Sequence, residues 1–187
     1  MLKNYILFAG VNGAGKTTLF QSAENYISLQ RINMDEIVRE FGSWKNQKDV
    51  SKAGMIAVRK ISECFEKGIS FNQETTLCGK SIFRNVNRAK DPGYEILLLY
   101  VGLESAELAK ERVRQRVFNG GHGIPDEDIE RRYHESFDNL KTLLPLCDQV
   151  KIYDNTDSFS KIASFVNGVC VDGAEIIPKR QEEQKTE

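Results

Sequence analysis

The chain has 187 residues, of which 40% are hydrophobic and 28% are charged, and its formal net charge is −1. This length suits one domain with a real core, and the composition is that of an ordinary globular protein. The balanced charge argues against a nucleic-acid or anionic-membrane partner. No apolar run approaches eighteen residues and no signal-peptide pattern is present, so we expect no membrane span and a cytoplasmic protein.

The first predicted element is a buried strand over residues 5–9, followed by the glycine-rich stretch "GVNGAGKT" at residues 10–17. Its spacing, G-x-x-x-x-G-K-T, is that of the phosphate-binding loop of P-loop nucleotide enzymes. Glycines let successive backbone N–H groups face one phosphate, Lys16 supplies a cation, and the Thr17 hydroxyl ligates magnesium. A glycine turn beside an unrelated lysine is the alternative. The predicted phosphate-binding residues are Gly10, Val11, Asn12, Gly13, Ala14, Gly15, Lys16, Thr17 and Thr18, with Thr17 as the metal ligand.

Hydrophobic spacing and turn residues predict the elements that follow. Leu19, Ala23, Tyr26 and Ile27 recur at helical spacing after the loop. In chain order we then expect a strand at 31–34, a helix at 35–41, a polar connection at 43–49, a helix at 50–67 with Met55, Val58, Ile61 and Phe65 on one stripe, a strand at 69–76, a helix at 80–90, a strand at 95–101, helices at 106–118 and 125–144, and a strand at 149–155.

Strands that alternate with helices predict a parallel sheet covered on both faces. The expected fold class is therefore α/β: a P-loop kinase-like three-layer α/β/α fold with a mostly parallel five-stranded sheet. A helical, arginine-rich lid is expected over about 106–144, and a small C-terminal hairpin around Asp172–Gly173. We expect a single kinase domain over residues 1–177 and a polar tail over 178–187. The ligand of such a sheet binds beyond the carboxyl ends of its strands.

The predicted lid favours a small-molecule kinase over other P-loop classes. The chain lacks the N-K-x-D motif of GTPases and the apolar strand ending in Asp of motor ATPases. Small P-loop kinases close lid arginines onto the transferring phosphoryl group. The candidates here are Arg112, Arg114, Arg116, Arg131 and Arg132. The alternative is a solvated helix whose acidic residues pair with them. His122, between lid glycines, is expected to be a flexible-loop residue rather than a catalyst.

Two carboxylates follow predicted strands on the ligand side of the sheet. Asp35 comes just after the second strand, where it can take the proton of an acceptor hydroxyl, or alternatively cap the following helix. Glu74 ends the third strand beside Thr75, where it can hold acceptor hydroxyls or water on magnesium; a cap or turn role is the alternative. The pair predicts an acceptor site beside Lys16.

The stretches "GVNGAGKTT", "INMDEI", "AGMIAVRKISECFEKGISFNQETTL", "RVRQRVFNGGHGIPDEDIERRYHESFDNL" and "YDN" together resemble the zeta-toxin family of P-loop kinases, over residues 4–166. The resemblance implies a phosphotransferase that uses ATP and Mg²⁺. It further implies UDP-N-acetylglucosamine as acceptor, phosphorylated on the 3′-hydroxyl of the sugar.

By position, Lys16 and Thr17 match the family's P-loop lysine and magnesium-binding threonine, and Asp35 matches its general base. Glu74 falls where the family has a sugar-binding acidic residue, and Arg116 matches the first phosphate-clamping arginine. Arg132 is chosen as the second, with Arg131 close behind. On this basis we assign Lys16, Asp35, Arg116 and Arg132 to catalysis, and Glu74, Thr75 and Arg131 to acceptor binding.

The chain differs from the toxic members in its short length at both ends, which makes an antitoxin partner doubtful and leaves toxicity and the particular sugar nucleotide open. Two other functions remain alternatives. One is a kinase for a different acceptor, such as a nucleoside, a sugar or a nucleic-acid end. The other is a nucleotide-binding regulator that hydrolyses ATP slowly or not at all.

Overall fold

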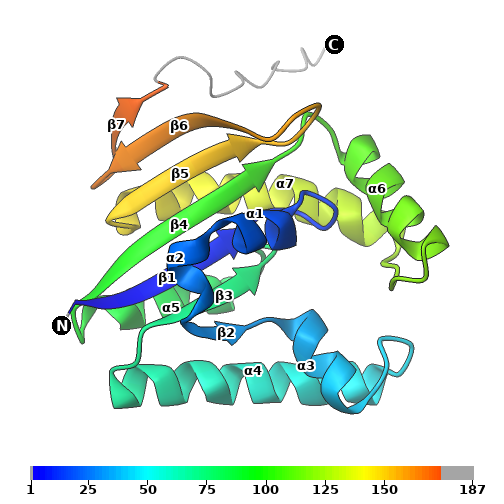
Figure 1. The fold of residues 1–187 in the computed structure, drawn as a ribbon, viewed down its shortest axis with the longest axis horizontal. Coiled ribbons are helices and arrows are strands. Elements are labelled where there is room, and N and C mark those ends of the chain that lie inside the picture. The colour runs from blue at the N-terminus through cyan, green and yellow to red at the C-terminus, as the bar shows by residue number, and fades with distance from the viewer. Residues whose placement is uncertain (1, 174–187) are drawn as a thin grey trace, which may run out of the picture.

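A single seven-stranded sheet organises the chain in the computed structural model, which describes residues 2–173 (Figure 1). The strand order is β2-β3-β1-β4-β5-β6-β7. The pairs among the first five strands in that order are parallel, whereas β5–β6 and β6–β7 are antiparallel. The strands are β1 (Lys3–Ala9), β2 (Gln30–Ile32), β3 (Phe71–Thr75), β4 (Tyr94–Gly102), β5 (Gln149–Asp154), β6 (Ser160–Val166) and β7 (Val169–Asp172).

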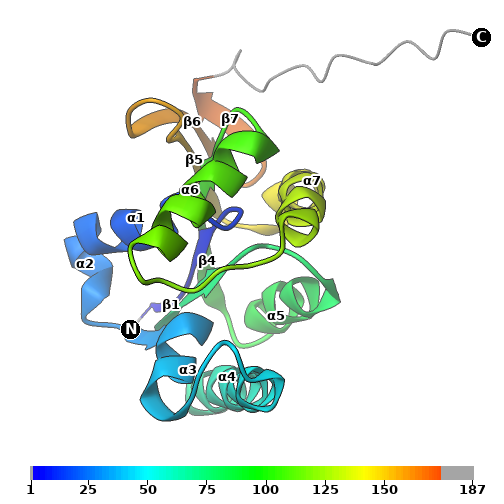
Figure 2. The same ribbon diagram turned by 90° about the vertical axis from the view of Figure 1, so that its right-hand side faces the viewer.

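Helices cover both faces of this sheet, as the α/β/α prediction requires (Figure 2). α1 and α6 pack on one face and α4, α5 and α7 on the other. The helices are α1 (Lys16–Ser22), α2 (Glu24–Ile27), α3 (Met34–Phe41), α4 (Gln47–Lys67), α5 (Lys80–Lys90), α6 (Ala106–Phe118) and α7 (Asp126–Leu143), followed by a 3-10 turn at Leu144–Leu146. No helix within residues 2–173 is long and apolar enough to cross a membrane.

The apolar run of β1 is continuous because this strand lies at the centre of the sheet and both of its faces are buried. Tyr5 and Leu7 point into the core under α4 and α5, whereas Ile6 and Phe8 point into the core under α1 and α6. All four are 0–1% exposed. A strand covered on both faces cannot alternate apolar and polar residues, so β1 lies rigidly between two cores and fixes the position of the loop that follows it.

The sheet has seven strands rather than the predicted five. The five predicted strands form its parallel part, and β6 and β7 extend it with an antiparallel hairpin. The hairpin turns at Asn167–Gly168, where both residues have positive φ, and not at Asp172–Gly173. Asn-Gly is the favoured pair for such a turn. The second half of the predicted hairpin and the tail over 178–187 lie outside the described residues.

Two predicted helices differ in detail. The helix after the glycine loop ends at Ser22 because Ala23 leaves helical geometry (φ −95°, ψ 64°), and the separate α2 follows. On α4 half of the predicted stripe is confirmed: Ile61 and Phe65 are buried, whereas Met55 and Val58 are 68% and 65% exposed. The rest of the buried face consists of Ala53, Ala57 and Cys64. Small residues in the first half of the helix allow it to lie close to the sheet, and Met55 and Val58 face outward.

The predicted lid corresponds to α6, a glycine-rich connection and α7, but it is anchored in the core. Ala109 and Val113 of α6 and Ile129 of α7 belong to the core cluster beneath the glycine loop. Leu140 and Leu143 of α7 belong to the core on the opposite face of the sheet. The connection between the helices, residues 119–125, is therefore the part of the lid with least support from the core.

Candidate functional site

The glycine-rich loop bends tightly between β1 and α1. Gly10 has φ +140°, and a Cβ at this position would lie 2.3 Å from the carbonyl oxygen of Val101. Gly15 has φ +102° at the N-cap of α1, and a Cβ there would lie 2.5 Å from Asn155 Nδ2. Side chains disfavour both conformations. Asn155, after β5, also donates to the carbonyl oxygen of Ala14 at 2.9 Å, which ties the loop to the neighbouring strand end.

Lys16 lies inside this loop with only 8% of its surface exposed. Its Nζ donates to the carbonyl oxygen of Val11 at 3.1 Å. Burial lowers the pKa of Lys16, and the nearby carboxylates of Glu74 and Asp35 oppose that shift. A buried ammonium held by one carbonyl and faced by carboxylates is suited to bind a polyphosphate.

Glu74, at the end of β3, is the centre of a polar network below the loop. It lies beside Phe8 in the β1–β3 register, one residue before the end of β1. Its Oε2 accepts from Arg31 at 2.6 Å and from Asn33 Nδ2 at 2.9 Å. The Thr17 hydroxyl donates to the same carboxylate, 3.3 Å from either oxygen. Glu74 is thus fixed next to the predicted metal-ligand threonine.

Asp35 does not cap α3, because Asn33 performs that function. The Asn33 side chain is the N-cap and accepts from the Asp35 backbone N–H at 2.8 Å. The Asp35 carboxylate instead lies 3.4 Å from Nε2 of His122, which comes from the connection between α6 and α7. His122 stacks on Trp44 with ring centroids 4.6 Å apart. Burial lowers the pKa of His122, opposed by Asp35. His122 therefore packs against the predicted base and does not extend into solvent.

The lid arginines divide into a half-buried and an exposed group. Arg132 donates to the Asn12 side chain of the glycine loop at 3.1 Å. Nη2 of Arg116 lies 3.3 Å from His122, and its Nε is buried without a partner among the described residues. Arg131 instead forms exposed ion pairs with Asp128 and Glu135. Arg132 thus contacts the glycine loop and Arg116 contacts His122, whereas Arg131 is engaged in ion pairs at the surface.

One cavity of about 730 Å³ brings most of the predicted site residues together. It lies beyond the carboxyl ends of β1, β2 and β3, where ligands of such sheets bind. Gly10, Val11, Ala14 and Thr18 are predicted site residues that do not line it. Those that do are Asn12, Gly13, Gly15, Lys16, Thr17, Asp35, Glu74, Thr75, Arg116, Arg131 and Arg132.

Trp44 and Asn33 also line the cavity and were not predicted as functional. Arg112, one of the predicted lid arginines, lines the cavity too and donates to the carbonyl oxygen of Thr156 at 2.8 Å. Arg31 supports Glu74 from behind. Asn33 and Arg31 could have been found from "RINMDE", because polar residues at the end of a parallel strand face the ligand edge. No local signal marks Trp44, whose position depends on the distant His122.

Arg131 and Arg132 are adjacent on α7 but make different contacts, so variants of the two form a matched pair. We expect Arg132→Ala to lower the rate of phosphoryl transfer about a hundredfold, because a cation held against the glycine loop is lost. Arg131 also lines the cavity, but its guanidinium is engaged in exposed ion pairs, so Arg131→Ala should change the rate less than about threefold. Steady-state kinetics of both variants test these expectations. Equal losses of rate would contradict the assignment of Arg132, but not Arg131, to phosphoryl transfer.

The Glu74 network should also matter for stability. In the Arg31–Glu74 pair both side chains are 11% exposed, so Glu74→Ala leaves a largely buried guanidinium with one partner fewer. We expect a loss of about 2 kcal/mol in the free energy of unfolding, measured by urea denaturation. Glu66→Ala, which breaks the exposed pair with Arg88, should lie within about 0.5 kcal/mol of the parent. Equal stabilities for the two variants would argue against the network.

The sheet order, the glycine loop between β1 and α1, and the cavity at the strand ends define a P-loop protein of the kinase type. A family model described as Zeta toxin matches residues 3–164. The chain belongs to the zeta toxin family, which confirms the resemblance drawn from its motifs.

Three individual proteins that resemble the chain are 14–29% identical to it. An uncharacterized protein of Haemophilus influenzae is 29% identical over 133 residues, covering 71% of this chain and 94% of that protein. A structure from the PezAT chromosomal toxin–antitoxin system of Streptococcus pneumoniae has a TM-score of 0.64 at 20% identity, covering 87% of this chain and 72% of that one. A structure of the AvrRxo1-ORF1:-ORF2 complex with ATP has a TM-score of 0.66 at 14% identity, covering 93% and 62%. At these identities the two structures show a shared fold.

Proposed function

We propose that the chain is an ATP-dependent kinase that transfers the γ-phosphate of ATP to a hydroxyl of a small acceptor. The observation that carries this proposal is the cavity shared by Lys16, Asp35, Arg116 and Arg132. A regulator that only binds nucleotide would need the loop and Lys16. It would not need a carboxylate and lid arginines in the same cavity.

Each side chain has a defined task in this proposal. Lys16 holds the outer phosphates, and Arg116 and Arg132 neutralise charge on the transferring phosphoryl group. Asp35 accepts the proton of the acceptor hydroxyl as the bond to phosphorus forms. His122 contacts both Asp35 and Arg116, so the proposed base and a lid arginine lie on the same side of the cavity.

The residues present fit a magnesium ion. Mg²⁺ prefers hard oxygen ligands and is bound through few protein groups. The Thr17 hydroxyl and the Glu74 carboxylate are such donors and already lie together at 3.3 Å. Thr17 would hold the ion directly and Glu74 would hold one of its waters. When bound, the ion would neutralise phosphate charge. Holding a magnesium-bound water differs from the acceptor contact that the family resemblance implies for Glu74. Thr75 remains a candidate for the acceptor contact.

UDP-N-acetylglucosamine is the proposed acceptor, on the basis of family membership. The test is to incubate the protein with ATP, magnesium and this sugar nucleotide, and to search by mass spectrometry for a product one phosphate heavier. The product is expected with the parent and reduced at least a hundredfold with Asp35→Asn. Its absence with the parent would exclude this acceptor, and a different hydroxyl compound would then be sought.

A protein partner is part of the proposal. The short sequence made an antitoxin partner doubtful. The similar pneumococcal structure comes from a toxin–antitoxin system, which goes against that expectation. We therefore include an inhibitory partner that covers the cavity. Such a partner would lower ATP turnover when co-expressed with the chain.

A further inference from the structure

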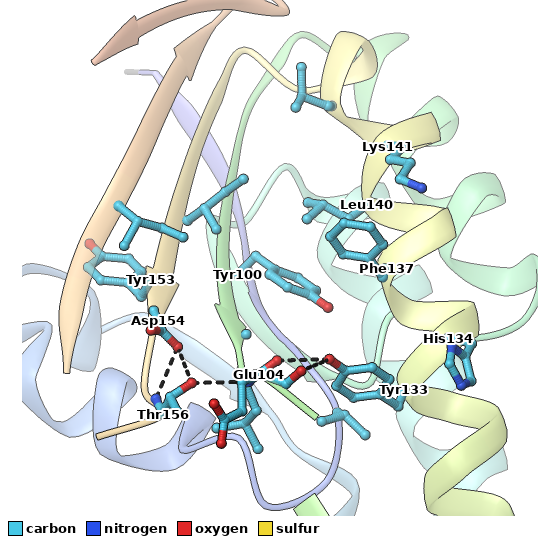
Figure 3. Close-up of a pocket in the computed structure, with 16 residues that line it drawn as sticks. Tyr100, Glu104, Tyr133, His134, Phe137, Leu140, Lys141, Tyr153, Asp154 and Thr156 are labelled. Carbon is cyan, nitrogen blue, oxygen red and sulfur yellow. Dashed lines mark hydrogen bonds between the residues drawn. The ribbon is translucent and has the colours of Figure 1, made fainter. Parts of the chain in front are cut away.

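A second cavity, of about 410 Å³, lies between the sheet and α7 (Figure 3). Its walls come from β4, β5, β6 and α7, and none of its lining residues lines the phosphate cavity. The volume lies within the range of small-molecule sites. The proposed kinase reaction uses none of these side chains, so the cavity needs a separate explanation.

The interior of this cavity is apolar and aromatic. Ile152 and Ile162 line the sheet side, and Phe137 and Leu140 line the α7 side. Tyr100 of β4 lies between them, with its hydroxyl pointing toward α7 in Figure 3 and accepting from Ser136 at 3.3 Å. Burial raises the pKa of Tyr100 to about 12, so this hydroxyl stays neutral. A flat apolar body is the shape that fits between a strand surface and two aromatic rings.

The mouth of the cavity is acidic. Glu104 and Asp154 both line it, and neither carboxylate forms a salt bridge with any residue in the range 2–173. Asp154 is held in place by Thr156, whose backbone N–H and hydroxyl donate to it at 3.0 and 2.6 Å. On the α7 side of the cavity, Lys141 already pairs with Asp138, and the His134 imidazole lies 3.5 Å from a carboxylate oxygen of Glu130. The uncompensated charge at the mouth is therefore negative.

The cavity touches both the glycine loop and the base of the lid. Val11 of the loop forms part of its wall. The Tyr133 hydroxyl of α7 donates to the carbonyl oxygens of Leu103 and Glu104, at 3.0 and 2.9 Å, in the turn that leads into α6. An occupant would therefore contact the segment that joins the two lid helices to the sheet.

We propose that this cavity is a second ligand site, which binds a small organic cation with a flat apolar body and an amine or amidine end. The apolar body lies between Ile162 and Phe137, and the cationic end lies at the carboxylates of Glu104 and Asp154. Charge complementarity at the mouth selects the cation over a neutral or anionic analogue. The site shares no lining residue with the phosphate cavity and does not depend on the identity of the kinase acceptor.

The test titrates the full chain with biphenyl-4-carboxamidine, following amide shifts by NMR with a non-hydrolysable ATP analogue and magnesium present in excess. We expect saturable binding with a Kd of roughly 1 mM or lower, the level expected for a ligand of this size. Biphenyl-4-carboxylate should bind about tenfold more weakly or worse. Absence of saturable amidine binding, or its displacement by the nucleotide analogue, would overturn the proposal.

Three variants locate the binding. Ile162→Trp fills the cavity and should abolish amidine binding, whereas the control Val58→Trp, on the exposed face of α4, should leave it unchanged. Glu104 is exposed and its backbone alone forms hydrogen bonds among the described residues, so Glu104→Gln should weaken the amidine several-fold and leave biphenyl-4-carboxamide unaffected. Unchanged amidine affinity in Glu104→Gln, or retained binding in a folded Ile162→Trp, would contradict the assignment.

Discussion

Lys16→Ala is expected to lower phosphoryl transfer by about three orders of magnitude without unfolding the protein. The side chain is 8% exposed, its one hydrogen bond joins it to the Val11 carbonyl oxygen, and it belongs to neither hydrophobic core cluster. Burial disfavours its charge in the absence of an anion. Removing it therefore takes a cation from the transferring phosphates and costs little stability. Turnover and thermal melting of the same sample measure both effects.

Lys16→Met serves as the companion variant, because it keeps the length and apolar stem of the side chain and removes only the charge. Its loss of turnover should match that of Lys16→Ala. ATP turnover near the parental value in either variant would show that the glycine loop does not hold the reacting phosphates.

Asp35→Asn is expected to slow transfer by about two to four orders of magnitude while ATP affinity stays near the parental value. The amide keeps the shape of the side chain, and α3 keeps its cap because Asn33 supplies it. The contact with His122 can remain as a hydrogen bond. What is lost is the group that accepts the proton from the acceptor hydroxyl. Single-turnover kinetics with saturating ATP separate this loss from nucleotide binding.

The neighbouring carboxylate gives the control. Glu36 pairs with Arg31 and is 44% exposed, outside the cavity lining. Glu36→Gln should change transfer less than about threefold, as expected for a partly exposed ion pair. If Glu36→Gln and Asp35→Asn slowed transfer equally, a specific role of Asp35 as base would be untenable.

The sequence predicted the parallel part of the fold well because its signals are local. The run Tyr5–Ala9 is apolar at every position, as a strand between two cores must be, and Gly10 and Gly15 mark backbone conformations that side chains disfavour. The position of Asp35 at the strand ends could also be predicted, because a residue that follows a parallel strand lies at the carboxyl edge of the sheet.

The features that the sequence did not predict are of two kinds. Some depend on contacts between residues distant in sequence, and others carry a local signal that favours a different interpretation. The stack of Trp44 on His122 joins residues far apart in the chain, so no local pattern indicated it. On α4 the prediction is right for Ile61 and Phe65 and wrong for Met55 and Val58, because the small residues Ala53 and Ala57 form the first half of the buried face. Asn167–Gly168 is a strong hairpin signal, and the hairpin turns there and not at the predicted Asp-Gly pair.

We expect the cavity to transfer phosphate to an organic hydroxyl rather than to water. Incubating the protein with γ-labelled ATP, magnesium and a small-metabolite extract tests this most directly. Most of the released label should appear in an organic phosphate ester, and Asp35→Asn should abolish this product while retaining ATP binding. Label that appears only as inorganic phosphate, at the same rate with and without the extract, would contradict it.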